Sequence, residues 1–177
     1  LIEKWEEEAK KEHPQKLRYV LRDLATQEGA FAYEYTGYLA NIYSVETYYR
    51  SNIDMLESKK FYSLFSPNQK IYTKVKNEEP TYYAESSKVS RSQFASGSIV
   101  EGEVINSVIS RNTKIKTGSS VKHSVLFPRV KVGENATVEY AIVDKGVEIG
   151  EGVVIRGTAE DPIVVKKGQK VTEDIIR

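Results

Sequence analysis

Few side chains in this sequence are suited to chemistry. The 177 residues include two histidines, His13 and His123, and no cysteine, so a zinc site, a disulfide and a cysteine nucleophile are not expected. His123 has no carboxylate nearby in the sequence that would orient it as a general base. His13 precedes Pro14, which should end a helix. We therefore expect structural or surface roles for both histidines.

A basic row is the next candidate for a functional site. It consists of Arg111, Lys114, Lys116, Arg129 and Lys131. Guanidinium and ammonium groups bind phosphate, and arginine does so by bidentate contact. The more common role of such a row is a solvated, charged edge. Asp144, Glu148 and Glu151 lie beside glycines, which is ordinary turn chemistry and predicts no metal site.

Composition excludes several classes of protein. The formal net charge of +1 argues against a dedicated nucleic-acid binder or a polybasic membrane binder. Hydrophobic residues make up 40% of the chain, enough for a core, yet no run approaches the ~18 consecutive apolar residues of a membrane span. The first five residues are amphipathic and acidic, unlike a signal peptide. We therefore expect neither nucleic acid nor a membrane as a partner.

Residues 1–57 are predicted to form helices and one strand. Apolar residues at helical spacing predict helices over Leu1–Glu12, Lys16–Thr26 and Val45–Leu56, and Ser44 is a suitable N-cap for the third. Alternation over Phe31–Tyr35 predicts a strand.

Residues 58–82 are predicted to be a connector. Ser66–Asn68 and Glu78–Pro80 have the composition of turns. Between them, Lys70–Val75 alternates like an edge strand.

From Val89 onward the sequence repeats, and this is its strongest signal. The phrase Val104-Ile-Asn-Ser-Val-Ile recurs in similar form from Val121 and from Val138, 17 residues apart each time. Six residues make a short strand and a tight turn, and three such faces close a triangular coil. A second ladder with the same spacing consists of Ile115, Val132 and Ile149. Aliphatic residues at equivalent positions should therefore stack into one interior column.

These repeats predict a mostly β fold, a left-handed parallel β-helix of hexapeptide type over residues 83–177. The left hand is a property of hexapeptide coils, since most crossovers between parallel strands are right-handed. A ladder of small residues should occupy one corner of each coil: Ser107, Ser124, Ala141 and Thr158. Corners that need a permissive backbone are expected at Gly118, Gly133, Gly146, Gly150 and Gly152.

Several segments resemble one protein family. Gly37–Tyr49, followed by Asn52–Leu56, resembles the end of the sugar-nucleotide pyrophosphorylase domain of bacterial ADP-glucose pyrophosphorylases, whose catalytic members read G-Y-W-R-D-V-G-T, a helix and N-M-D-L-L. Gly97–Ile109 is similar to the β-helix domain of that family, and Gly157–Gly168 looks most like its GlgD branch. The resemblance implies that residues 1–57 are the C-terminal remnant of a nucleotidyltransferase-like α/β domain.

The departures from the family pattern concern catalysis. Asn41 stands where the catalytic members have an aspartate that the resemblance assigns to the catalytic magnesium. An amide carries no negative charge and is a poor Mg²⁺ ligand. A Gly-rich loop that could cradle nucleotide phosphates is also missing from these residues. The resemblance therefore implies that these residues alone do not catalyse the reaction and hold no cofactor, and that magnesium belongs to a catalytic partner.

The function implied by the resemblance is that of a regulatory, non-catalytic subunit. It would pair with a catalytic GlgC-type subunit in a cytoplasmic hetero-oligomer, a tetramer, which makes ADP-glucose from ATP and glucose 1-phosphate for glycogen synthesis. The basic row (Arg111, Lys114, Lys116, Arg129 and Lys131) would bind phosphorylated effectors, and the β-helix would supply an interface and permit self-association. Two alternatives stay open: a catalytic glucose-1-phosphate adenylyltransferase with a degenerate motif, and a hexapeptide acyltransferase in which His123 deprotonates an acceptor hydroxyl.

Overall fold

A computed structural model describes residues 2–27, 29–31, 33–66, 70–74 and 76–177. The chain divides into two compact units, Leu1–Thr36 and Gly37–Arg177. No helix in the described part is long and apolar enough to cross a membrane.

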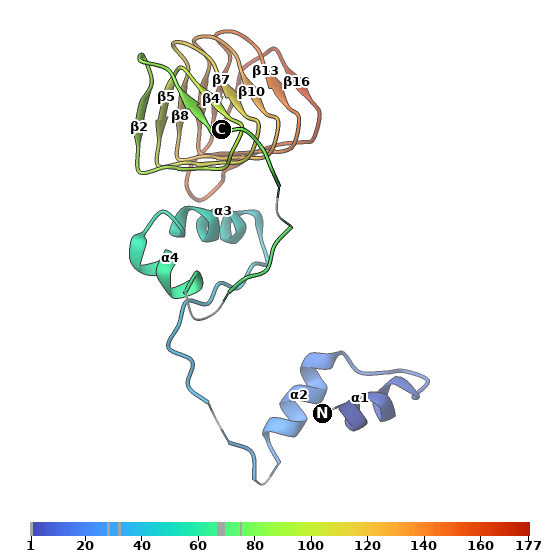
Figure 1. Cartoon of the computed structure of the whole chain (residues 1–177). Coiled ribbons are helices and arrows are strands. Elements are labelled where there is room, and N and C mark those ends of the chain that lie inside the picture. Colours follow the sequence, from blue (N-terminus) through green and yellow to red (C-terminus); the bar gives the residue numbers. More distant parts are fainter. Residues whose placement is uncertain (1, 28, 32, 67–69, 75) are drawn as a thin grey trace. The chain divides into compact units, whose positions relative to one another are not determined.

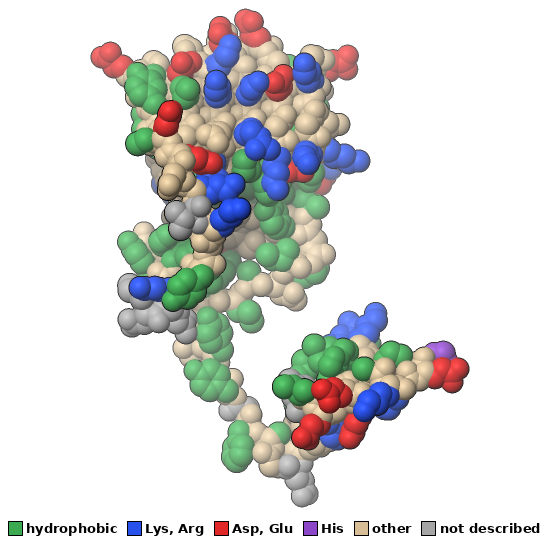
Figure 2. Space-filling model, turned by 45° about the vertical axis from the view of Figure 1, so that its right-hand side comes forward, with side chains coloured by type: hydrophobic (Ala, Val, Ile, Leu, Met, Phe, Trp, Pro, Cys, Tyr) green, Lys and Arg blue, Asp and Glu red, His purple; other side chains and the backbone are tan. Residues whose placement is uncertain are grey.

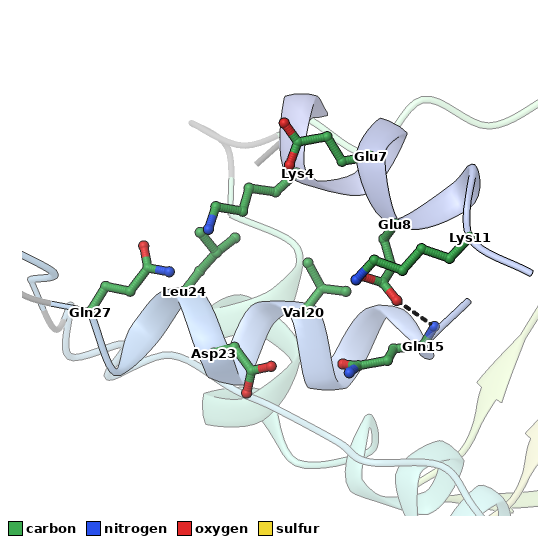
Figure 3. Close-up of a pocket in the computed structure, with 9 residues that line it drawn as sticks. All are labelled: Lys4, Glu7, Glu8, Lys11, Gln15, Val20, Asp23, Leu24 and Gln27. Carbon is green, nitrogen blue, oxygen red and sulfur yellow. Dashed lines mark hydrogen bonds and ion pairs between the residues drawn. The ribbon is translucent and has the colours of Figure 1, made fainter. Parts of the chain in front are cut away.

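The first unit contains two helices, α1 (Ile2–Ala9) and α2 (Leu17–Ala25). Both helices were predicted, and each is shorter than the segment over which the sequence predicted it. Glu8 closes the turn between them, because its carboxylate accepts hydrogen bonds from the Gln15 N–H at 2.9 Å and from Lys11 (Figure 3). The bond from Lys11 is the main cause of a lowered Glu8 pKa.

The strand predicted over Phe31–Tyr35 does not form. Phe31 and residues 33–35 have no strand pairing, and Phe31 is almost fully exposed. Ala32 lies outside the described residues. The edge strand expected over Lys70–Val75 is also absent from residues 70–74, while Val75 and the turn residues 67–69 lie outside the described part.

The second unit begins with two more helices, α3 (Val45–Asp54) and α4 (Ser58–Leu64). Ser44 caps α3 as predicted: its hydroxyl accepts from the Thr47 N–H, and the Thr47 hydroxyl accepts from the Ser44 N–H, which is a capping box. Residues 58–64 were expected to be part of a connector, so α4 was missed.

From Tyr82 onward the second unit is a parallel β-solenoid, which confirms the hexapeptide-type β-helix that the repeat predicted (Figure 1). Its 17 strands form three parallel sheets. Sheet A contains β1 (Tyr82–Tyr83), β4 (Ile99–Val100), β7 (Lys114–Ile115), β10 (Lys131–Val132), β13 (Glu148–Ile149) and β16 (Lys170–Val171). Sheet B contains β2 (Lys88–Ser90), β5 (Glu103–Ile105), β8 (Ser120–Lys122), β11 (Thr137–Glu139), β14 (Val154–Arg156) and β17 (Ile175–Ile176). Sheet C contains β3 (Gln93–Phe94), β6 (Val108–Ile109), β9 (Val125–Leu126), β12 (Ala141–Val143) and β15 (Ile163–Val165).

The register confirms the 17-residue coil. Val104, Val121, Val138 and Ile155 are successive partners in sheet B, and all four are fully buried. The first coil is shorter, since Val89 pairs with Val104. The predicted column of stacked aliphatic residues is therefore the core of this unit.

Stacked hydroxyl groups line one corner of the core. The Ser107 N–H donates to Ser92 Oγ, the Ser124 N–H to Ser107 Oγ, and the Ala141 N–H to Ser124 Oγ, at 3.1, 3.1 and 3.2 Å. Each serine thus satisfies a backbone donor of the next coil. The extension of this ladder to Thr158 was wrong, because Ile163 is the partner of Ala141 and Thr158 lies exposed in an inserted loop.

The glycines of the corners play two different roles. Gly118, Gly146 and Gly152 have positive φ, as expected for permissive corners. Gly133 and Gly150 do not. At Gly133 a Cβ would lie 2.7 Å from the backbone of Gly150, so the requirement there is close approach of two coils.

Helix α3 lies along the outer face of sheet C (Figure 1). Tyr49 in the middle of α3 packs with the outward-facing Val125 and Ile142, and at the end of the helix Gln93 Nε2 donates to the Met55 carbonyl at 2.7 Å. Ten helical residues measure ~15 Å, and four strands at a spacing of ~4.8 Å span ~14 Å. The helix therefore matches the width of β3, β6, β9 and β12, and Val45 at its start lines a hollow with Val164 of β15.

Candidate functional site

The structure gathers three of the five residues of the basic row on sheet A. Lys114 and Lys131 are register partners on adjacent strands, and they line a shallow hollow together with Lys116, Glu134 and Glu148. Figure 2 shows basic and acidic side chains interspersed over one face of the solenoid.

The other two residues of the row, Arg111 and Arg129, lie at the corner between sheets C and A. The Arg129 N–H donates to the Arg111 carbonyl at 3.0 Å, and the Arg129 backbone has a positive φ of 63°. Arg111 lies in a different part of the surface from the hollow, beside Glu78. The row is therefore split between a sheet face and a corner.

Carboxylates neutralise much of this row. Glu148 accepts from Lys131 at 2.6 Å, and this bond, with the nearby charge of Lys170, holds the Glu148 pKa below its ordinary value. Lys116 pairs with Glu134 at 3.4 Å.

Within the described residues, Lys114 and Arg129 have no ion-pair partner. Lys114 in the hollow and Arg129 at the corner are thus free cations, whereas Lys116, Lys131 and Arg111 each pair with a carboxylate.

Asn41 lies on the exposed segment that precedes α3. It lines a small hollow with Arg50 and Asp54, and Asp54 already accepts hydrogen bonds from the Tyr38 hydroxyl at 3.0 Å and from Lys60 at 2.7 Å. An amide, a cation and a paired carboxylate do not fit the ligand set of Mg²⁺. Among the described residues no group of three or more histidine, cysteine, aspartate or glutamate side chains could hold a metal ion.

His123 lies at a corner where its side chain has a packing role. Its ring stacks on Tyr140 with centroids 4.7 Å apart, and its Nδ1 is 2.9 Å from Asn106 Nδ2. Asn106, His123 and Tyr140 all have φ near +47°, so one left-handed turn is repeated in three coils. No carboxylate contacts the ring among the described residues. This environment supports the structural role and gives no support to a general base.

The sequence analysis did not predict the contact between α3 and sheet C. The sequence does contain a pattern that indicates it, because the outward positions of sheet C are apolar in successive coils: Val108, Val125, Ile142 and Val164. Outward positions of the other sheets carry charges in the same coils, such as Lys131 and Glu139. An apolar outer ladder on one sheet alone predicts that another element covers it.

Comparison with known proteins identifies relatives of both parts of the second unit. Residues 74–176 match the GlmU-like, C-terminal hexapeptide family. A relative named glycogen biosynthesis protein GlgD, from Bacillus subtilis (strain 168), is 41% identical over 136 residues, which are 77% of this chain and 40% of the relative. A protein of the same name from Geobacillus stearothermophilus is 50% identical over 127 residues, 72% of this chain and 37% of the relative.

More distant relatives carry an enzyme name. Glucose-1-phosphate adenylyltransferase from Clostridioides difficile (strain 630) is 34% identical over 100 residues, 56% of this chain and 26% of the relative. The chain thus spans about two fifths of the length of these two GlgD relatives, 40% and 37%.

Proposed function

The chain belongs to the GlmU-like, C-terminal hexapeptide family, and from this membership and its similarity to GlgD proteins we propose that it is the β-helix part of a regulatory, non-catalytic subunit for ADP-glucose synthesis. The subunit would act in glycogen biosynthesis, as the names of its relatives indicate. Its partner would be a catalytic GlgC-type subunit in a cytoplasmic hetero-oligomer, a tetramer, and the magnesium of the reaction would belong to that partner.

The observation that carries the proposal is Asn41. Nucleotidyl transfer depends on metal ions that neutralise phosphate charge, and in the catalytic relatives an aspartate is expected at this position. Here the side chain is a neutral amide that shares a hollow with Arg50, and the carboxylate that lines the same hollow, Asp54, is bonded to Tyr38 and Lys60. This arrangement supports a subunit that assists the reaction and does not perform it.

The basic row would supply regulation. We assign the binding of a phosphorylated effector to Lys114 and Lys131 on sheet A with Lys116 beside them, and to Arg111 and Arg129 at the adjacent corner. Arg129 and Lys114 would contribute most, since they need not leave a carboxylate.

An acyltransferase is less well supported, because the imidazole of His123 is stacked on Tyr140 and bonded to Asn106. The experiment must distinguish this proposal from the alternative of a catalytic adenylyltransferase with a degenerate motif. It predicts turnover without a partner.

The test uses the longest natural polypeptide that contains this sequence, assayed alone and with a GlgC-type partner. Synthesis of ADP-glucose is measured for the wild type, for Asn41→Asp and for the matched control Asn77→Asp, which adds the same charge at an exposed asparagine of the connector. The proposal predicts no turnover by the polypeptide alone in any form, and a mixture that exceeds the partner alone. Turnover by the wild type without a partner would place the protein among the catalysts.

A further inference from the structure

A carboxylate of the connector occupies the corner that carries Arg111 and Arg129. Glu78 lies shortly before β1, and its side chain reaches the first two coils of the β-helix. Its Oε2 is 3.6 Å from Arg111 Nε and accepts from Ser96 Oγ at 3.3 Å, and its Oε1 accepts from Asn112 Nδ2 at 3.4 Å. The Glu78 side chain is only 20% exposed. Three polar side chains of the corner therefore hold one carboxylate.

Each of these contacts is long. Hydrogen bonds between a cationic nitrogen and a carboxylate oxygen are ordinarily about 2.7–2.9 Å, and the bond between Lys131 and Glu148 on sheet A is 2.6 Å. The pair of Glu78 and Arg111, at 3.6 Å, is an ion pair without a hydrogen bond. An anion with more charge and more acceptor oxygens can make shorter, bidentate contacts with the same guanidinium. Such an anion can therefore displace Glu78.

A free cation lies one coil further along the same corner. Asn112 and Arg129 have positive φ angles of 56° and 63°, and they occupy equivalent positions of adjacent 17-residue coils. Adjacent coils are ~4.8 Å apart, so a phosphate group, with oxygens on several sides, can reach both Arg111 and Arg129. While Glu78 faces Arg111, half of that site is taken.

We infer that Glu78 is a built-in competitor for the anion, and that its displacement loosens the end of the connector. The inference rests on the proposed effector site and says how that site acts on the rest of the chain. The residues after Glu78 have other anchors: the Glu79 carbonyl accepts from the Gly97 N–H at 2.6 Å, and Thr81 Oγ1 donates to the Ala95 carbonyl at 2.8 Å. Displacement of Glu78 therefore leaves β1 in place. It weakens the hold of the corner on the segment that leads from α4.

The first experiment measures binding of inorganic phosphate to the whole 177-residue chain by NMR titration at constant ionic strength. Glu78→Gln should bind phosphate about two- to fivefold more tightly than the wild type, because the anion no longer has to break a part-exposed ion pair. Glu79→Gln is the matched control, since it removes the same charge from an exposed neighbour, and it should bind like the wild type. Arg129→Gln should weaken binding. Circular dichroism checks that each variant is folded.

The second experiment follows the connector. Because the chain has no cysteine, Asn77→Cys provides a single site for a spin label next to Glu78. Phosphate should increase the mobility of this label in the otherwise wild-type chain. In the Glu78→Gln background the label should be mobile without phosphate and should not respond further. A control label at Thr172→Cys, an exposed residue between β16 and β17, should respond in neither background.

The outcomes separate this inference from the proposed function. If phosphate binds and Arg129→Gln weakens the binding, but Glu78→Gln and Glu79→Gln bind alike, the effector site stands and the competitor role of Glu78 is wrong. An immobile label at position 77 in the presence of bound phosphate would overturn the link to the connector. If no form binds phosphate, Glu78→Gln included, the effector site is wrong and the inference falls with it. Binding that is lost in Lys114→Gln and kept in Arg129→Gln would place the anion in the hollow of sheet A and would also overturn the inference.

Discussion

The phenolic hydroxyl of Tyr49 donates a hydrogen bond to the main-chain carbonyl oxygen of His123 at 2.8 Å, across 74 residues of sequence. Tyr49 is 5% exposed, and burial raises the pKa of its hydroxyl. The contact joins α3 to a corner of the β-helix at a residue with positive φ. With the bond from Gln93 to the Met55 carbonyl, it is one of two polar anchors in a contact that also has an apolar cluster.

Tyr49→Phe should lower the stability of the α3 contact by about 1–2 kcal/mol, because the half-buried carbonyl of His123 loses its donor while the aromatic ring is kept. Urea denaturation measures the loss, and hydrogen exchange should show faster opening of α3 than of the solenoid. Tyr43→Phe, at a tyrosine that is 79% exposed, is the control and should change neither quantity. Equal effects of the two substitutions would show that the anchor has no special role.

Ser124→Ala should destabilise the β-helix by about 1–3 kcal/mol, since the buried N–H of Ala141 would be left without an acceptor. Ser120→Ala, which removes a hydroxyl that bonds the outward-facing Glu103, should stay within about 0.5 kcal/mol of the wild type. Thermal unfolding of both variants compares them directly. If Ser124→Ala is as stable as Ser120→Ala, water must reach the corner.

Gly133→Ala should cost about 1–3 kcal/mol, because the added Cβ would lie 2.7 Å from the backbone of Gly150 and force two coils apart. Gly146→Asn serves as the comparison. Nothing lies within 4 Å of a Cβ there, and asparagine accepts positive φ, as Asn112 does at the equivalent corner two coils earlier. The denaturant concentration at the unfolding midpoint should therefore be lower for Gly133→Ala than for the wild type and unchanged for Gly146→Asn.

Stability should depend on pH through Glu103. The hydrogen bond from Lys122 holds the Glu103 pKa below its ordinary 4.5. A carboxyl whose pKa is depressed by folding contributes stability above its unfolded pKa and loses it as the pH falls through the folded pKa. In Lys122→Met the largest cause of this contribution is removed, while Ser120 and Lys88 still act on Glu103, so the variant should lose less stability than the wild type on acidification from neutral pH to below 4.5. Parallel acid denaturation curves for the two proteins would contradict the prediction.

Local periodicity predicted the β-helix because each coil repeats the same contacts with its neighbours. Val104, Val121 and Val138 carry that pattern, and their burial follows from it. The contact of Tyr49 with sheet C could not be read in the same way, since it joins segments with different periods. Continuing the 17-residue spacing to Thr158 failed for a related reason: a loop was inserted, and Ile163 restored the register.

The aromatic segment Phe31–Tyr35 shows a different limit. Alternating side chains make a strand only when a neighbouring strand accepts its backbone hydrogen bonds. No such neighbour is present for Phe31 or for residues 33–35. The role of Asn41, inferred from its type and its place in a motif, stays a prediction, and the structure adds that Arg50 lines the same hollow.

Because the length of α3 matches the width of the strands it contacts in sheet C, a change in the number of coils there would require a change in the length of the helix. One inserted coil would lengthen the sheet by ~4.8 Å, which equals about three helical residues at ~1.5 Å each. An insertion between β3 and β9 would then separate the two polar anchors, Gln93 with Met55 and Tyr49 with His123, unless α3 gained nearly a turn at the same time. Whole coils can be added beyond β15, where no helix spans them, without any such compensation. Variation in coil number among homologues should therefore concentrate at the C-terminal side of the solenoid.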